Sequence, residues 1–467
     1  MKKIIALLLA VVMVLGLVAC SSSADKTPDT TPAETTDNTP ADTTDTETKT
    51  DDTAADDTAA AASGKVYYLN FKPEFDEALQ KLASDYTAKT GVAVKVVTAA
   101  SGTYSDTLTA EMGKSEAPTI FNIGNMSGLA DWDDYALDLT GSAIANELNT
   151  DSFNLYNEAG ELKAIGNCYE SFGIIVNTKL LEEAGHSLDE IKDFDSLKAV
   201  ADDIHARASE LGFDAFSAAG LDGSSSWRFS GHLANMPLFY EFRDDGITSQ
   251  PAEIKGTYLS NFKDVWDLYT TDSATTGAAL LTATGDESEA EFGNSKAVFF
   301  QNGSWEYSNL VTDKDKGFLM DPADLAMIPI YCGVAGEDKA GLCCGTENCW
   351  SVNKNSKPED IQATLDFMKW VVTSDAGTTL MAEQFGPCPF KNAKEPENVF
   401  FADANRYIAS GNYVVTWAFN YTPAVDDWRA GVVDALGQYT ANGGDWANVE
   451  TAFVQGWAQQ YANENAG

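Results

Sequence analysis

Short apolar strands alternate with amphipathic helices from residue 65 onward, and this alternation limits the fold more than any other feature of the sequence. Residues 65–70 (KVYYLN) predict a strand, and residues 92–97 (VAVKVV) predict another. Between them, apolar side chains recur every three or four residues up to Gly91, a residue that favours the position after a helix. Alternation of this kind predicts an α/β chain with largely parallel sheets.

The same alternation continues along the chain, and no internal repeat interrupts it. The further elements that we expect are helices at 104–114, 179–184 and 194–211, strands at 119–123, 172–176, 297–300 and 326–330, a helix across 361–372, and two helices in the last ~45 residues.

The first 20 residues have the pattern of an export signal. Lys2 and Lys3 precede an apolar run from Ile4 to Leu15, which is shorter than the roughly 20 residues that cross a membrane. The run ends in LVAC, which resembles a bacterial lipobox. That resemblance implies a signal peptide at residues 1–19, a diacylglyceryl anchor on Cys20, and a location on the outer face of the bacterial cytoplasmic membrane.

Residues 20–64 predict a tether and not a folded domain. Residues 21–64 contain 13 threonines, 11 acidic residues and two lysines, and no aromatic or large aliphatic side chain. Such a segment cannot bury enough apolar surface to offset the entropy of ordering it. We therefore expect Cys20 and a disordered Thr/Asp-rich segment to hold a folded part, which begins near residue 65, away from a membrane.

The charge balance excludes several classes of function. The chain has 71 acidic and 30 basic residues, for a formal net charge of −41, and residues 65–467 hold 60 and 26 of them. A chain of this charge repels nucleic acids. Its three histidines cannot build a multi-histidine zinc site, and no Cys/His spacing offers a complete ligand set. We expect no metal and no other cofactor.

The sequence contains no motif of a nucleophilic enzyme. No GxSxG elbow is present, and so few histidines offer no plausible Ser-His or Cys-His pair. Gly113-Lys114-Ser115 looks like the end of a phosphate loop, but Leu108 stands where the first glycine belongs. A glycosidase needs only two carboxylates across a cleft, so a secreted carbohydrate hydrolase stays an alternative. A surface adhesin is a weaker one, because repeats are absent.

Five segments follow one another in a characteristic order across about 400 residues. They are YLNFKPEFDEALQKLASDYTAKTGVAVKV, APTIFNI, YESFGIIVNTKLLEEAG, FGNSKAVFFQNGSWEYSNL and WSVNKNSKPEDIQATLDFMKWVVTSDAGTTLMAEQFGPCPF. In this order, behind a lipobox and a tether, they resemble the family 1 extracellular solute-binding proteins of ABC importers, the group that includes maltodextrin-binding proteins.

The resemblance implies a two-lobed periplasmic-binding-protein-like α/β fold, whose lobes are joined by three crossing segments and close on a ligand in the cleft between them. Lobe 1 would comprise residues 65–172 plus 342–390, and lobe 2 residues 173–341 plus 391–467. The implied function is to capture a carbohydrate, an oligosaccharide, and to deliver it to an ABC transporter permease without catalysis. The family is usually monomeric. A peptide, a polyamine or another polar solute is the alternative ligand.

Sugar chemistry and the resemblance together select aromatic candidates. Sugars present flat apolar faces and rims of hydroxyls, which aromatic rings and planar polar side chains bind. Trp305, in QNGSWE, matches the family's G-x-W position, and Trp428, in PAVDDWRAGV, matches another aromatic position that faces the cleft; for both, core packing is the alternative. Glu170 falls on the first crossing strand, where the maltodextrin-binding group places an acid that contacts hydroxyls.

Polar candidates follow two of the predicted strands. Lys72 and Glu74 lie after the first strand, at the edge where open α/β sheets place ligands, although either could simply be solvated. Asn122 and Asn125 occupy the equivalent edge after TIFNI, where the family often has an aromatic or acidic residue. The expected site therefore departs from the family's pattern at this edge.

One loop supplies the remaining candidates. Trp227 and Arg228, in GSSSWRFSG, fit a mobile binding loop whose guanidinium binds a carboxylate or a pair of hydroxyls. Trp350 and Trp417 are weaker candidates, because each lies in an apolar or aromatic stretch that favours packing.

With Cys20 lipidated, an even number of cysteines remains, which permits disulfides in an exported protein. Given the lobe assignment, Cys168, Cys343 or Cys344, and Cys388 would lie near the crossing segments, where a disulfide would stiffen the hinge. The CCxxxxC cluster matches no zinc motif. The six remaining cysteines are Cys168, Cys332, Cys343, Cys344, Cys349 and Cys388.

Overall fold

The computed structural model describes residues 64–151, 153–217 and 220–466. The predicted signal peptide, the lipidation site Cys20 and the predicted tether up to residue 63 lie outside the described residues. Within the described residues, all strands longer than single bridges belong to one of two six-stranded sheets.

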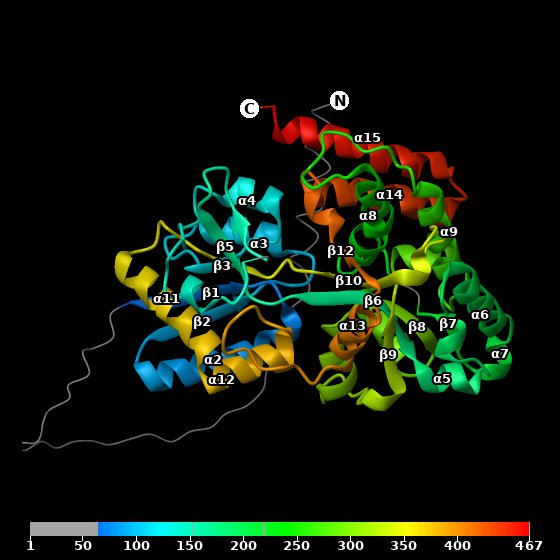
Figure 1. The fold of residues 1–467 in the computed structure, drawn as a ribbon, viewed down its shortest axis with the longest axis horizontal. Helices are drawn as coiled ribbons and strands as arrows, with labels where there is room; N and C mark the ends of the chain where they lie inside the picture. Colours follow the sequence, from blue (N-terminus) through cyan, green and yellow to red (C-terminus); the bar gives the residue numbers. More distant parts are fainter. Residues whose placement is uncertain (1–63, 152, 218–219, 467) are drawn as a thin grey trace, which may run out of the picture. The chain divides into compact units, whose positions relative to one another are not determined.

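The first sheet combines parallel and antiparallel pairs (Figure 1). β1 pairs in parallel with β2 and β3, whereas β11 is antiparallel to β3 and β5, and β5 to β4. The strands in order across the sheet are β2 (Ala93–Thr98), β1 (Lys65–Asn70), β3 (Ile120–Asn122), β11 (Cys349–Val352), β5 (Leu162–Gly166) and β4 (Leu155–Tyr156).

The second sheet is built around β6, whose eight residues are all buried. β6 is antiparallel to β8, β9 and β10, whereas β10–β12 and β7–β8 are parallel pairs. The strands in order are β12 (Tyr413–Thr416), β10 (Ala340–Gly345), β6 (Glu170–Asn177), β8 (Ala297–Gly303) and β7 (Asp214–Phe216), with β9 (Leu325–Ile328) also paired to β6.

The prediction of largely parallel sheets is therefore wrong, because antiparallel pairs outnumber parallel ones in this fold. A strand–helix–strand unit such as β1–α2–β2 does return in parallel. In contrast, β6 and β11 are each reached from the other sheet through a short crossing without a helix. Local alternation says nothing about the direction of a strand that enters from another sheet.

The helices confirm most of the sequence predictions, including the two C-terminal helices. They are α2 (Asp76–Thr90), α3 (Tyr104–Met112), α4 (Met126–Trp132), α5 (Thr178–Glu183), α6 (Phe194–Ala206), α7 (Ala208–Leu211), α8 (Ala234–Asp245), α9 (Leu259–Thr271), α10 (Gly285–Gly293), α11 (Pro358–Thr373), α12 (Asp375–Leu380), α13 (Val399–Ala409), α14 (Val425–Asn442) and α15 (Trp446–Glu464).

Local sequence explains how several elements form and end. In α2, the apolar side chains at helical spacing are buried, and the helix packs on β2 (Figure 1). Gly91 ends α2 with a φ of 76°, a left-handed conformation that glycine adopts freely, and its N–H donates to the Thr87 carbonyl at 2.8 Å. The helix expected over 194–211 is instead split at Arg207, whose guanidinium donates to the Ala184 carbonyl at 2.7 Å, a tertiary contact that periodicity does not reveal.

Three segments carry the chain between the two sheets. Residues 167–169 lead from β5 to β6, residues 346–348 lead from β10 to β11, and the chain after Phe390 leads to α13. The first two run side by side, because the Asn167 N–H donates to the Asn348 carbonyl at 2.8 Å. These crossings bring the end of the first sheet and the start of the second to one place.

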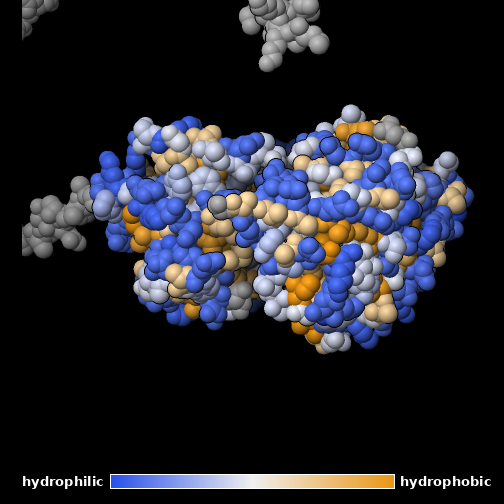
Figure 2. Space-filling model, turned by 90° about the horizontal axis from the view of Figure 1, so that it is seen from above, coloured by the Kyte–Doolittle hydropathy of each residue, from blue (hydrophilic) through white to orange (hydrophobic). Residues whose placement is uncertain are grey.

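The helices and sheets enclose separate apolar cores, and the outside is largely polar. One core surrounds β6 and β8 and extends to α14 and α15, and another lies between β1, α2 and α11. Figure 2 shows hydrophilic residues over most of one face, with smaller hydrophobic patches among them. Among the described helices, none combines the length and apolar character needed to cross a membrane.

Candidate functional site

The paired crossings place Glu170 at the start of β6, opposite Gly345 of β10. Asn348, in the neighbouring crossing, donates from Nδ2 to Glu170 Oε2 at 2.7 Å. Glu170 is 3% exposed. The topology therefore fixes a buried carboxylate at the junction between the two sheets.

Lys72 reaches the same carboxylate from the loop after β1. Asn70 holds this loop, since its Nδ2 donates to the Lys72 carbonyl at 2.7 Å and its Oδ1 accepts from the Lys72 N–H at 3.1 Å. Lys72 Nζ lies 2.8 Å from Glu170 Oε1 and 3.8 Å from Glu74 Oε1, and the Lys72 side chain is 11% exposed. The structure thus brings together three of the predicted polar residues.

Charge pairing keeps the Lys72 ammonium group ionised despite its burial. Burial by itself lowers the pKa of Lys72, but the carboxylates of Glu170 and Glu74 outweigh it and raise that pKa above its usual value. For Glu74 the balance is the reverse: burial raises the pKa of its carboxyl group more than the attraction of Lys72 lowers it. A buried ion pair of this kind gains little stability overall, but losing one partner strands the other charge.

Trp305 lies directly after β8 and forms the aromatic wall of the cluster. Its ring covers Gly303, where a Cβ atom would stand 2.2 Å from the ring, so the glycine of the G-x-W pattern makes room for the tryptophan. Lys72 Nζ lies 4.9 Å from the centroid of the Trp305 ring, within cation–π distance. Trp305 is partly exposed and joins the predicted polar residues.

Trp227 and His232 extend the aromatic wall. Their ring centroids lie 5.9 Å and 5.4 Å from that of Trp305, and His232 also stacks on Phe172 at 4.0 Å. Gln301 Nε2 and His232 Nδ1 are 2.9 Å apart. Burial, together with three nearby cations, moves the pKa of His232 well below its usual range, so the ring is neutral.

Arg228, which we expected to lie in a mobile binding loop, is instead buried and hydrogen-bonded within the protein. It is 1% exposed, and it donates to the Gln301 carbonyl at 3.3 Å and to Ser288 Oγ at 2.8 Å. Burial lowers the pKa of its guanidinium to about 10. These hydrogen bonds link the segment that contains Trp227 and Arg228 to β8 and α10, so the guanidinium holds Trp227 in place.

The backbone holds the side chain of Asn125, after TIFNI, whereas the buried side-chain amide of Asn122, within TIFNI, has no hydrogen-bond partner among the described residues. Asn125 caps α4, with its Oδ1 accepting the Gly128 N–H at 2.8 Å. Asn122 is buried in β3, where its N–H donates to the Tyr104 hydroxyl at 2.7 Å. Neither residue contacts the Lys72–Glu170 pair.

Trp428 lies in a core and does not join the other candidates. It is 1% exposed, its Nε1 donates to the Phe453 carbonyl at 2.9 Å, and it packs edge-on against Phe453 and Trp457. The start of α14 was expected to face the cleft at this residue. Instead, Nη2 of the neighbouring Arg429 lies 3.8 Å from Oε1 of Glu347, a residue of the second crossing.

Sequence reasoning missed several residues of the cluster. Asn348, Glu347, Arg429 and His232 are brought there by the crossings and by helix packing, and no local pattern in the sequence identifies them. Glu306 is different: it directly follows Trp305 and is buried beside it, so inspection of the G-x-W segment could have found it.

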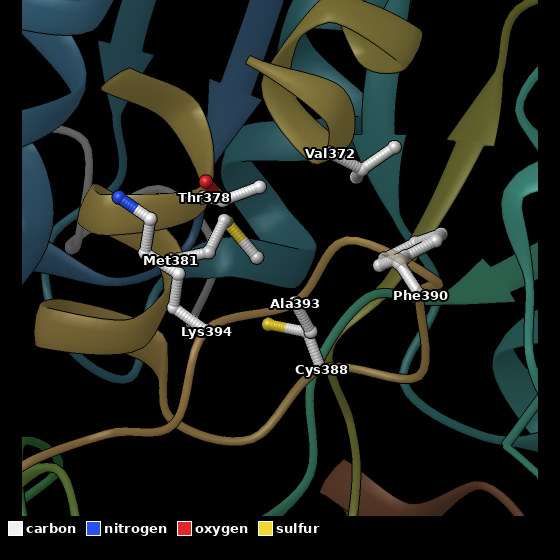
Figure 3. A pocket seen from close by; sticks show the side chains of 7 residues that line it. All are labelled: Val372, Thr378, Met381, Cys388, Phe390, Ala393 and Lys394. Atoms are coloured by element: carbon white, nitrogen blue, oxygen red, sulfur yellow. The ribbon is translucent and has the colours of Figure 1, made fainter. Parts of the chain in front are cut away.

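Two cavities lie away from this cluster. Figure 3 shows one of about 10 Å³, room for about one water molecule, lined by Met381 and Cys388 among others. The other, of about 450 Å³, lies between α9 and α14 and includes Asp267 and Tyr439. Neither of these two cavities is lined by Trp305 or Glu170.

The structure also shows the state of the cysteines. All six cysteines of the described residues are free thiols, so the expected hinge disulfide is absent from this structure. Cys168 is instead buried with the half-buried Cys388 near it, and loss of contact with water raises the pKa of both thiols. Within residues 64–151, 153–217 and 220–466, no group of three His, Cys, Asp or Glu side chains could hold a metal ion.

A family profile matches more than two thirds of the chain. The family profile described as bacterial extracellular solute-binding protein matches residues 81–407. The solute-binding protein RafE in complex with raffinose, known also in an apo form from Streptococcus pneumoniae, is 17% identical with a TM-score of 0.68, and the match covers 85% of this chain and 100% of that one.

Two further solved structures have the same fold. An ABC transporter solute-binding protein from Thermotoga lettingae bound with α-D-tagatose is 11% identical with a TM-score of 0.65. A sugar transporter from Bacillus licheniformis in complex with stachyose is 16% identical with a TM-score of 0.61. Both matches cover 85% of this chain and 100% of the other. No curated protein matches the sequence.

At these identities the solved structures establish the fold: two α/β sheet units joined by crossing segments. The family profile spans more than two thirds of the chain and describes the same class of protein. This protein therefore belongs to the bacterial extracellular solute-binding proteins.

Proposed function

We propose that this protein captures a carbohydrate, an oligosaccharide, at the cluster around Trp305 and Glu170. The observation that carries the proposal is the meeting of an aromatic ring with a buried ion pair, because Lys72 Nζ lies 2.8 Å from Glu170 Oε1 and 4.9 Å from the Trp305 ring centroid. Sugars require this combination of apolar surface and directed polar groups. The raffinose, tagatose and stachyose bound by proteins of the same fold support the ligand class.

Each residue has a distinct part in this proposal. Trp305 and Trp227 supply aromatic surface for a sugar ring, and Glu170 accepts hydrogen bonds from hydroxyls. Lys72 and Glu74 supply further charged contacts. Asn348 uses its Nδ2 on Glu170, and its buried Oδ1 has no hydrogen-bond partner, which leaves that oxygen for a hydroxyl of the ligand.

Ligand entry requires the cluster to open. Lys72 and Ser101, beside the first sheet, contact Trp305 and Ser224, beside the second, and the Ser101 Oγ lies 3.1 Å from the Ser224 carbonyl. We propose that lobe 1 comprises residues 65–172 plus 342–390 and lobe 2 residues 173–341 plus 391–467. Sheet membership supports this division, with β10 spanning the boundary at 342. Opening would separate these contacts while the crossings bend.

The remaining parts of the proposal concern the cell surface. The LVAC sequence supports a lipid anchor on Cys20, and the acidic tether supports a folded part held outside the cytoplasmic membrane. The family match supports delivery of the solute to an ABC transporter permease. The protein would act as a monomer and release its ligand chemically unchanged.

A thermal-shift screen against mono- and oligosaccharides, peptides and polyamines tests this function, with calorimetry for each hit and recovery of the ligand afterwards. A ligand at 100 times its dissociation constant stabilises the fold by about 2.7 kcal/mol, which is measurable. We expect an intact oligosaccharide to register and Trp305→Ala to abolish the shift.

Trp370→Ala is the matched control, because Trp370 is also partly exposed but packs on Tyr86, away from the cluster. This variant should keep the ligand-induced shift. Cleavage of the sugar would instead make the buried carboxylates catalytic, and a response to peptides or polyamines alone would reject the carbohydrate.

A further inference from the structure

Glu306 directly follows Trp305, and its carboxyl group is held inside the protein. The residue is 7% exposed. Asn302 Nδ2 donates to its Oε1 at 2.8 Å, and Asn309 Nδ2 donates to its Oε2 at 3.3 Å. Both partners are neutral amides, so they orient the carboxyl group without neutralising its charge.

No cation pairs with Glu306. Among the described residues, no lysine, arginine or histidine forms an ion pair with its carboxylate. The positive charge of Arg228 attracts the Glu306 carboxylate, but that guanidinium already donates hydrogen bonds to the Gln301 carbonyl and to Ser288. Glu289 of α10 and Glu74 of the first-sheet loop repel it. Ionisation of a buried carboxyl group without a counter-charge is costly, so Glu306 keeps its proton until a cation from outside supplies the opposite charge.

The surroundings of Lys72 show that this region suits an ammonium group. Its Nζ has two carboxylates and the face of Trp305 around it, at 2.8, 3.8 and 4.9 Å. Carboxylates and aromatic faces are the partners that ammonium groups bind. Glu306 follows Trp305 in the chain and is near enough to Glu74 to be repelled by it, and no ammonium group of the described residues pairs with it.

Unpartnered acceptors in the cluster point to the same kind of ligand. Asn348 Oδ1 and Gln301 Oε1 belong to buried side chains and have no hydrogen-bond partner. Their Nδ2 and Nε2 atoms are already engaged, by Glu170 and His232, which fixes both oxygens as free acceptors. A ligand rich in N–H and O–H donors would satisfy them.

Other ligand chemistries match these observations less well. An anionic solute would add negative charge beside Glu306, Glu74 and Glu170. A metal ion lacks a donor set, because the described residues contain no group of three ligating side chains. A neutral sugar would satisfy the amide oxygens but would leave Glu306 protonated and would not use the charge that its carboxylate can offer.

We infer that the solute is an amino sugar oligomer, a carbohydrate with a protonated amine that pairs with Glu306 while the ring lies beside Trp305. This inference rests on the proposed function, since it assumes a carbohydrate in the same cluster. It makes Glu306 a specificity-determining residue, which selects the amine against a hydroxyl or an acetylated amine.

Binding of such a ligand has a proton signature. Burial, with Glu289 and Glu74, raises the pKa of Glu306 to about 8, so much of the carboxyl population is protonated at pH 6.5. An ammonium group beside it lowers that pKa, and the carboxyl group then releases a proton to the buffer. A sugar without charge does not cause this release.

Isothermal titration calorimetry on the full chain at pH 6.5 tests the inference. The probes are a glucosamine oligomer with free amines, its fully N-acetylated counterpart of the same length, and raffinose, each in two buffers of different ionisation enthalpy. We expect the free-amine oligomer to bind at least tenfold tighter than its acetylated counterpart, with proton release for the free amine alone.

Glu306→Gln should remove both the proton release and the preference for the amine. Glu210→Gln, the same change at an exposed position, should keep both. Equal binding of the two oligomers to the wild-type protein, or a preference that survives in Glu306→Gln, would overturn the inference. If the Glu306→Gln variant folds poorly, the comparison of the two oligomers on the wild-type protein still tests the inference.

The outcomes also separate the two proposals. Binding of raffinose or of the acetylated oligomer without preference for the amine would retain the proposed function and overturn this inference. If none of the three carbohydrates binds, this inference fails, and the wider screen then decides the proposed function.

Discussion

Trp305 and Trp428 have the same side chain in two contrasting regions of the molecule. Trp305 follows β8, is partly exposed, and has the Lys72 ammonium 4.9 Å from its ring centroid. Trp428, near the start of α14, is 1% exposed, and its one polar atom bonds the Phe453 carbonyl. The difference shows that one tryptophan can lie partly exposed beside buried charge, where it could meet a ligand as we propose, while another fills a core in which the backbone satisfies its N–H.

The largest effect that we expect is on the Trp428 side of this comparison. Trp428→Ala should lower the free energy of unfolding by about 3–5 kcal/mol, because it leaves a large cavity between α14 and α15. Urea denaturation measures the change, and Trp428→Phe should cost less because it keeps an aromatic ring there. Near-wild-type stability together with lost sugar binding would instead place Trp428 in the site.

The next largest effect concerns the buried ion pair beside Trp305. Glu170→Gln should lower the free energy of unfolding by about 3 kcal/mol, because it leaves the Lys72 ammonium without its closest partner. The double variant Lys72→Met/Glu170→Gln should be destabilised by less than the sum of the two single variants. Additive losses in this double-mutant cycle would mean that the two side chains do not interact.

The Trp305 region should also respond to pH through Glu306. Its pKa is raised to about 8 by burial first and then by Glu289 and Glu74, so the folded state holds a proton that the unfolded state loses above about pH 4.5. The contribution of this group to the free energy of unfolding is therefore fully present at low pH, and it falls as the pH rises toward 8. The slope for one proton is at most about 1.4 kcal/mol per pH unit.

Denaturation of wild type and Glu306→Gln between pH 5 and 8 measures this dependence. The variant should have a flatter profile than the wild type across that range. Parallel profiles would show that Glu306 titrates alike in the folded and unfolded states.

A smaller effect, on binding, concerns Trp305 itself. Trp305→Ala should weaken binding of the oligosaccharide at least tenfold, or about 1.4 kcal/mol, because it removes the aromatic surface. Calorimetry with the ligand found in the screen measures the loss. Unchanged affinity would remove Trp305 from the site and end the contrast with Trp428.

The smallest effect should come from a residue that the structure places outside both regions. Asn125→Ala should cost about 1 kcal/mol of stability, because Asn125 Oδ1 caps α4. Sugar affinity should stay at the wild-type value. A clear loss of affinity would return Asn125 to the binding residues that sequence analysis proposed.

Much of the fold could be predicted from local patterns. The spacing of apolar residues identifies α2 and α11, and Gly91 marks the end of α2, because periodicity and backbone freedom are properties of a few consecutive residues. Strand direction could not be predicted in the same way. β6 and β11 enter their sheets through crossings of three residues, and long-range pairing sets their direction.

The site was predicted where a residue's role depends on neighbours in the chain. Trp305 needs Gly303 two residues earlier, and both are visible in one motif. Arg228 resembles a ligand-binding residue in the sequence, and only the packing of β8 and α10 around it shows that its hydrogen bonds are already taken. Asn348 lies 178 residues from Glu170 and has no local pattern that connects the two.

The sequence alone determined several helices and strands, such as β1, α2 and α11, which part of the chain can form a core, and which family it resembles, because composition and periodicity act over short stretches. Tertiary structure decided which polar side chains meet. The crossings bring Lys72, Glu170 and Asn348 to one buried point, and burial there changes what a charge costs. That cost depends on neighbours distant in the sequence, so it arises only once the two sheets are joined.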